Sequence, residues 1–246
     1  MPDSRRQELT LVFGSFVAVS MLVAVFVRAL DVELPVVGHV GSAMVAITLL
    51  YAPVLVAWRR QVDLAEYGFT VQPLGRSLLY TAVVLAIIVP AFAVGYALFY
   101  QTVCEPDSAL RALGLPGVCA RFGGFEGAGW PGFDREFAEQ ILIQLVVVAL
   151  PEELFFRGFL LTHLERALPP KLRILGGGVG WALVISAALF ALIHLPKHGD
   201  PRALATFFPG LLFGWLRSAT GSILSSTVTH ASSNLLVNVV ERVFLR

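Results

Sequence analysis

Residues 141–161 read ILIQLVVVALPEELFFRGFLL, an apolar run of membrane-helix length that nevertheless carries Glu152, Glu153 and Arg157. About 20 mostly apolar residues are enough to cross a bilayer as a helix. Charged side chains at that depth are costly, so they face a protein interior or a wet cavity and usually mark function. The run therefore predicts a membrane helix that contributes carboxylates to a buried polar site.

The two glutamates are expected to have different roles. Neighbouring residues on an α-helix point about 100° apart, whereas Arg157 follows Glu153 by four residues and can pair with it on one face. We therefore expect Arg157 to neutralise Glu153, and Glu152 to face another direction without a local partner. Such a carboxylate suits a general base or acid. The alternative is a packing network of all three charges that only fixes helix positions.

Two later apolar segments supply the other polar side chains, in Phe190-Ala-Leu-Ile-His194 and His230-Ala-Ser-Ser-Asn234. His230 and Asn234 are one turn apart on the same face and offer two hydrogen-bond donors suited to a developing oxyanion. An interfacial position for His194, and interhelical hydrogen bonds for the pair, are the alternatives. Taken together, these residues and Glu152 predict one catalytic site. No role is expected for the remaining histidines, His39, His163 and His198.

The composition places the chain in the multi-pass membrane class. Of its 246 residues, 57% are hydrophobic and 14% charged, against about 45–50% and about 25% in soluble domains. The net charge of +1 is uninformative, but the lack of a basic run points to no nucleic-acid partner, and lipids are the expected surroundings. The first apolar run follows Arg5 and Arg6 and lacks a small-residue cleavage site, which predicts a retained helix.

The expected fold is an all-α polytopic bundle of about seven membrane helices, with eight as the alternative, in one membrane domain spanning residues 1–246. The expected segments are Leu9–Val27, Val36–Trp58, Leu78–Tyr100, Phe137–Leu161, Leu175–Leu195, Leu204–Leu216 and Ile223–Leu245. The sixth is shorter than a straight span needs. To bring His194 to the depth of Glu152, either the fifth helix begins late, near Trp181, and dips only partway, or the fourth is broken at Pro151. We favour a combination of the two, with a water-filled cavity open to one membrane face.

Residues 101–136 are rich in Gly and Pro and predict an extramembrane loop, with a short helix around Asp107–Leu113. Both cysteines, Cys104 and Cys119, lie in this loop. The sequence is compatible with a disulfide between them and equally with two unpaired thiols. Basic residues in short loops favour a cytoplasmic N-terminus. In this orientation, nine basic residues of short segments lie on the cytoplasmic side and five on the opposite side. The nine are Arg5, Arg6, Arg59, Arg60, Arg76, Arg166, Lys171, Arg173 and Arg217. The five are Arg28, Lys197, Arg202, Arg242 and Arg246.

Three motifs in this order resemble those of the CPBP intramembrane proteases, which include CAAX prenyl endopeptidases of the Rce1 type and bacterial Abi proteins. The motifs are Glu152-Glu153-x-x-x-Arg157, Phe190-x-x-x-His194 and His230-x-x-x-Asn234. The stretch from Arg217, RSATGSIL, is similar to the family's connector, and the resemblance covers roughly residues 137–238 as a catalytic core. The chain departs from the pattern at Ser225-Ser226-Thr227, where relatives often have Trp-Ala-Pro.

The resemblance implies an endopeptidase in which Glu152 and His194 activate water and His230 and Asn234 form the oxyanion hole, with Arg157 orienting or neutralising Glu153. It implies no metal or cofactor, with zinc on Glu152, His194 and His230 as the alternative. Expected substrates are membrane-anchored or lipidated peptides, such as C-terminal sorting segments or bacteriocin-related peptides, in the inner membrane of a prokaryotic cell. A proton-coupled transporter and a catalytically silent scaffold or immunity protein are the alternatives outside the protease class.

Overall fold

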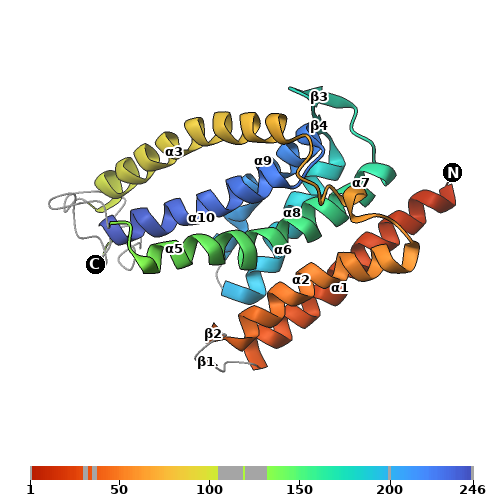
Figure 1. Ribbon diagram of the computed structural model, residues 1–246, viewed down its shortest axis with the longest axis horizontal. Helices are drawn as coiled ribbons and strands as arrows, with labels where there is room; N and C mark the ends of the chain where they lie inside the picture. Colours follow the sequence, from red (N-terminus) through yellow and green to blue (C-terminus); the bar gives the residue numbers. More distant parts are fainter. Residues whose placement is uncertain are drawn as a thin grey trace.

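The computed structural model describes residues 2–29, 33–34, 38–104, 119, 132–198 and 201–244, which form a bundle of long helices (Figure 1). Six of the described helices are α1 (Pro2–Ala29), α2 (Val40–Arg60), α3 (Leu74–Cys104), α8 (Trp181–His198), α9 (Phe207–Thr220) and α10 (Leu224–Phe244). Between α3 and α8 runs a helical rod made of α5 (Arg135–Leu142), η3 (Ile143–Ala149), α6 (Leu150–Glu153), η4 (Leu154–Leu160) and α7 (Leu161–Ala167). The predicted all-α bundle is confirmed.

Short elements connect the helices in the described part of the chain. They are the hairpin of β1 (Glu33–Leu34) and β2 (Gly38–His39), the 3₁₀ turn η1 (Leu64–Tyr67), the hairpin of β3 (Leu172–Ile174) and β4 (Gly177–Val179), and the 3₁₀ turn η5 (Pro201–Thr206). Both hairpins are antiparallel.

Three of the described helices are long and apolar enough to cross a membrane, namely Asp3–Ala29, Val40–Arg60 and Leu74–Cys104. Trp181–Pro196 is a shorter apolar helix. Only 6% of the most apolar part of α3 is buried within the protein. Long apolar helices with outward-facing side chains satisfy their own backbone hydrogen bonds and are therefore compatible with lipid. The protein is accordingly an integral membrane protein.

The helical rod lies at the centre of the bundle (Figure 1). The α1–α2 pair packs against one side of it, while α3 runs along α10 on another side. Every residue from Pro151 to Leu161 is buried. Phe155, Phe156 and Phe159 are completely inaccessible and form part of the largest apolar core. The carboxylates of Glu152 and Glu153 are therefore surrounded by protein and not by lipid.

The rod passes Pro151 without a break, so the alternative of a broken fourth helix is wrong. Proline lacks an N–H and its ring collides with the carbonyl four residues earlier in an α-helix. Here the turn before it is widened, because η3 is π-helical and the Leu150 N–H bonds to Leu145 O, five residues back. A second π-helical stretch, η4, follows Glu153. Such turns are rare and occur often at functional sites.

The fifth helix begins at Trp181, which is the late start that the depth of His194 required. The expected segment from Leu175 is wrong at its N-terminal end, because residues 172–179 form the β3–β4 hairpin. Its two turn residues, Leu175 and Gly176, have φ values of 46° and 80°, as in the tight turns that suit twisted hairpins. The sixth helix, α9, has only 14 residues and follows η5, so it is short as expected.

The predicted loop over 101–136 is shortened at both ends, because α3 continues to Cys104 and α5 starts at Arg135. Cys104 is joined to Cys119 by a disulfide, with the two Cα atoms 5.2 Å apart. The short helix expected around Asp107–Leu113 lies outside the described residues. The disulfide therefore ties the C-terminal end of α3 to Cys119, 15 residues further along the chain.

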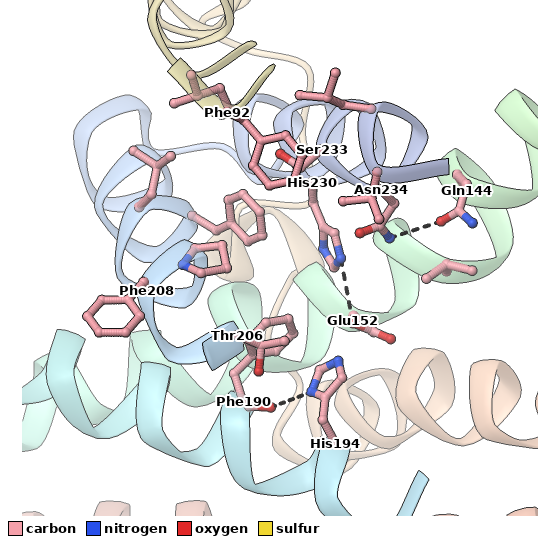
Figure 2. Close-up of a pocket in the computed structure, with 17 residues that line it drawn as sticks. Phe92, Gln144, Glu152, Phe190, His194, Thr206, Phe208, His230, Ser233 and Asn234 are labelled. Carbon is pink, nitrogen blue, oxygen red and sulfur yellow. Dashed lines mark hydrogen bonds and ion pairs between the residues drawn. The ribbon is translucent and has the colours of Figure 1, made fainter. Parts of the chain in front are cut away.

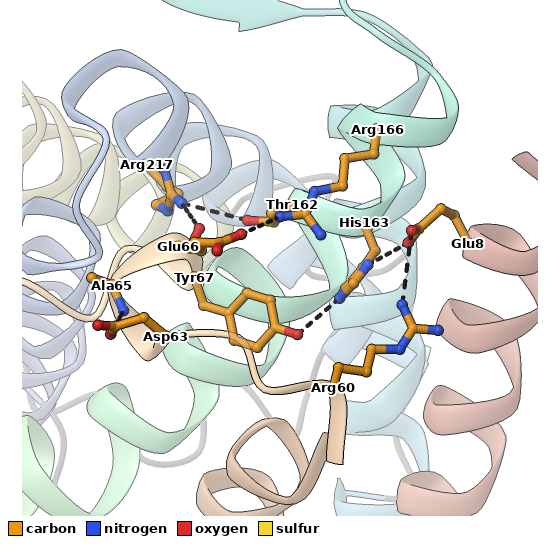
Figure 3. Close-up of polar contacts among 10 residues, drawn as sticks. All are labelled: Glu8, Arg60, Asp63, Ala65, Glu66, Tyr67, Thr162, His163, Arg166 and Arg217. Carbon is orange, nitrogen blue, oxygen red and sulfur yellow. Dashed lines mark hydrogen bonds and ion pairs between the residues drawn. The ribbon is translucent and has the colours of Figure 1, made fainter. Parts of the chain in front are cut away.

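A buried polar cluster joins α1, α2, η1 and α7 (Figure 3). His163 contacts Glu8 through Nδ1 and the Tyr67 hydroxyl through Nε2, at 3.1 Å. Arg60 lies 3.8 Å from Glu8. Burial raises the pKa of the Tyr67 phenol above its usual 10.0, so the phenol stays protonated and donates to Nε2 of His163. His163 then donates from Nδ1 to Glu8. No role was expected for His163, yet its contacts join α7 of the rod to α1 and η1.

Gly158 is required where η1 crosses the rod. A Cβ atom there would lie 2.8 Å from the backbone oxygen of Tyr67 and 3.2 Å from Leu154 Cδ1. We expect Gly158→Ala to lower the free energy of unfolding by about 1–3 kcal/mol, because backbone cannot give way cheaply. Unfolding by SDS in mixed micelles measures the effect. Gly14→Ala is the control, since no atom of the described residues lies within 4 Å of its Cβ position. Equal stability of both variants would contradict this account.

Candidate active site

All four side chains predicted to be catalytic line one cavity of about 700 Å³ (Figure 2). Glu152 comes from α6, His194 from α8, and His230 and Asn234 from α10. The rest of the wall is mostly apolar and includes Ile88, Phe92, Phe208, Leu212, Leu236 and Val237. A largely apolar cavity into which a few polar groups converge is typical of a substrate or ligand site.

A buried ion pair lies beside the cavity. Arg157 Nη1 lies 3.0 Å from Glu153 Oε1, and both side chains are fully inaccessible. The guanidinium also donates to the Gly210 carbonyl at 3.3 Å. Its central carbon lies 4.0 Å from the centre of the Phe190 ring and 5.3 Å from that of Phe213. These ring faces stabilise the cation where water is excluded, so the charge of Glu153 is balanced inside the protein.

His230 connects the two glutamates. Its Nδ1 lies 2.9 Å from Glu153 Oε1, and because a carboxylate can only accept, Nδ1 carries the proton. Its Nε2 then faces Glu152, 3.8 Å from Oε2. The ring lies parallel to that of Phe213, with 17° between the planes and 4.9 Å between the centres. Position and tautomer of His230 are thereby fixed from two sides.

The contact that Glu152 makes with another helix was not predicted. Arg157 pairs with Glu153 on the rod, and His230 of α10 approaches Glu152 from across the cavity. The contact joins residues 78 positions apart, which the sequence spacing does not reveal. Glu152 is therefore one member of a chain of contacts that runs through His230 to Glu153 and Arg157.

Hydrogen bonds set the direction of the His194 ring and of the Asn234 carboxamide. His194 Nδ1 lies 2.7 Å from the Phe190 carbonyl oxygen, so Nδ1–H donates and Nε2 is an acceptor in the neutral ring. Asn234 Nδ2 donates to Gln144 Oε1 at 2.9 Å, which leaves the second N–H of the same nitrogen. With both rings neutral, the site thus combines three acceptors, Glu152 and the Nε2 atoms of His194 and His230, with an amide donor.

Three residues of the site were missed by the sequence analysis: Gln144, Phe213 and Ser233. Gln144 and Ser233 line the cavity, and Phe213 packs on His230. Gln144 could have been found as an isolated amide in the apolar run that carries the glutamates. Phe213 and Ser233 have no such signal, because aromatic and small residues are common throughout membrane helices.

The donor set was also compared with the needs of zinc, the alternative with Glu152, His194 and His230 as ligands. Structural and catalytic zinc sites use at least three protein ligands at about 2.0–2.3 Å. Within the part of the chain that the structure describes, no three His, Cys, Asp or Glu side chains are grouped in this way. Glu153 accepts from Nδ1 of His230, while Nε2 of the same ring faces Glu152.

Residues 135–236 match the family model of type II CAAX prenyl endopeptidase Rce1-like proteins. The match begins with α5, ends within α10 and contains all three motifs on which the resemblance rests. No curated protein and no solved structure matches the chain. The matched family consists of CAAX-protease-like endopeptidases of membranes. The resemblance of the three motifs to the CPBP and Rce1-type proteases is thereby confirmed over residues 135–236 of the chain.

Proposed function

We propose that this protein is an intramembrane endopeptidase that hydrolyses a peptide bond with water activated by Glu152 and His194. The observation that carries the proposal is the convergence of these two side chains, His230 and Asn234 on one cavity with a mostly apolar wall. The family match supports the reaction class. The scheme uses no metal and no cofactor.

Water activation requires two acceptors and a base. A water between Glu152 and His194 donates one hydrogen to the carboxylate and the other to Nε2, and its lone pair then points to the substrate carbonyl carbon. Glu152 takes the proton as the carbon–oxygen bond forms. As the carbon–nitrogen bond breaks, Glu152 passes this proton to the leaving amine. The second hydrogen of the water stays on the new carboxyl group, so the peptide is split into a carboxylic acid and an amine without a covalent enzyme intermediate.

The developing oxyanion is stabilised from α10. Asn234 supplies the N–H that Gln144 does not use. His230 donates from Nε2 when its ring carries both protons, and Glu153 balances the positive charge that the ring then has. Donors aimed at the developing charge in a site without bulk water contribute strongly to catalysis.

The substrate is proposed to be a membrane-anchored or lipidated peptide or protein cut near the membrane surface. The apolar side chains of α3, α9 and α10 around the cavity suit its anchor. Substrates of this kind include C-terminal sorting segments and bacteriocin-related peptides. We place the protein in the inner membrane of a prokaryotic cell with its N-terminus in the cytoplasm, because basic residues in short loops favour that orientation.

A cleavage assay in proteoliposomes tests the proposal. The purified protein is incubated with a library of peptides that carry a lipid or transmembrane anchor, and new termini are identified by mass spectrometry. The same peptides without anchors are the matched control, and we expect them to be cleaved much more slowly. Absence of cleavage in every anchored peptide, together with proton flux driven by a pH gradient, would favour the transporter alternative instead.

A further inference from the structure

Gln144 is a polar side chain of the cavity that lies outside the three family motifs. It belongs to η3 and its Oε1 accepts the hydrogen bond from Asn234 Nδ2 of α10, at 2.9 Å. Figure 2 shows the two carboxamides end to end at the edge of the cavity. We propose that Gln144 is a positioning residue, which sets the direction of the Asn234 carboxamide for the reaction. The inference rests on the proposed function.

The π-helical backbone explains how Gln144 reaches the cavity. Residues four apart are about 40° out of line in an α-helix of 3.6 residues per turn. The bonds of η3 span five residues, which widens the turn and reduces this offset. Gln144, Val148 and Glu152 follow one another at four-residue steps, and all three line the cavity. The same widened turn that accommodates Pro151 thus brings Gln144 and Glu152 to one face.

The chemistry of a carboxamide explains why its direction needs a partner. The terminal torsion of asparagine is broad and roughly two-fold, so its own rotamer does not select the nitrogen or the oxygen end. The carbonyl oxygen of Gln144 can only accept, and it therefore faces Nδ2 of Asn234. Without this acceptor both directions are populated. In the reversed direction, Oδ1 replaces the nitrogen and an N–H is lost from the oxyanion site.

The kinetic test uses Gln144→Leu, which removes the acceptor and introduces an apolar side chain that also favours the helix. We expect kcat for an anchored peptide to fall roughly tenfold with KM within about twofold, less than the 10²–10³ lost when an oxyanion donor is removed outright. In an Asn234→Ala background the same change should cost less than about twofold, because the two residues act as one unit. Gln140→Leu, one turn earlier on the same helix, is the control.

A second measurement does not depend on activity. The chain contains only two asparagines, Asn234 and Asn238. Selective ¹⁵N-asparagine labelling therefore gives two side-chain amide signals, which Asn238→Asp assigns. We expect Gln144→Leu to shift or broaden the Asn234 signal, and Gln140→Leu to leave it in place.

Two results would overturn the inference. One is an unmoved Asn234 signal in Gln144→Leu. The other is a loss of kcat that simply adds to that of Asn234→Ala, since Gln144 would then act on its own. Both results concern the Gln144→Leu variant, so they do not contradict peptide hydrolysis by the unmodified protein, and the proposed function stands. If the unmodified protein cleaves no anchored peptide, the proposed function fails, and the amide signal alone decides whether Gln144 sets the direction of Asn234.

Discussion

Replacing Glu152 with glutamine is expected to lower peptide hydrolysis about a thousandfold, within the 10²–10⁴ range of general acid–base catalysis. Glutamine has nearly the same shape but cannot take the proton of the attacking water. Glu152 is the carboxylate that lines the cavity, whereas Glu153 is fully buried and engaged with Arg157 and His230. Glu153 is therefore not placed to substitute for it.

The Glu152→Gln variant should fold as well as the unmodified protein. A neutral amide is cheaper to bury than a carboxylate, and functional residues often reduce stability. We expect an unfolding midpoint in SDS mixed micelles that is unchanged or higher. Glu139→Gln makes the same chemical change at an exposed position of the same rod, where Glu139 pairs with Arg135, and should retain full activity. Full activity of Glu152→Gln would contradict the assignment of the general base.

The parts of the site that the sequence predicts are those that depend on spacing within one helix. Arg157 four residues after Glu153, and His230 four residues before Asn234, lie on common faces whatever surrounds them. Apolar runs of membrane length likewise predict the all-α bundle and the order of its segments. Local geometry alone is sufficient for these features.

Contacts between helices could not be predicted, because they depend on how each helix is rotated against its neighbours. The bond from His230 to Glu153 and that from Asn234 to Gln144 both cross from α10 to the rod. The rotation of the rod itself is set by π-helical turns around Pro151, and proline suggests a break as readily as a widened turn. The cluster of Tyr67, His163 and Glu8 was missed for the same reason.

Replacing Arg157 with methionine is expected to cause the largest loss of stability, about 3–5 kcal/mol, because it leaves a buried carboxylate without its cation. Arg157 and Glu153 are both fully inaccessible. The guanidinium also loses its contacts with Phe190 and Phe213. Unfolding by SDS in mixed micelles measures the loss. Arg166→Met removes an arginine of the same rod whose pairing with Glu66 is exposed, and should cost less than about 1 kcal/mol.

A double variant separates the charge from the packing. Adding Glu153→Gln to Arg157→Met removes the unbalanced carboxylate, so we expect it to recover at least half of the lost stability. Activity should not recover with it, because a neutral side chain at position 153 no longer balances the doubly protonated ring of His230. In the double variant we therefore expect the free energy of unfolding to recover and the rate of peptide hydrolysis to stay low. If hydrolysis returned along with stability, the buried pair would serve only to fix the helices, and the proposed charge balance at His230 would be wrong.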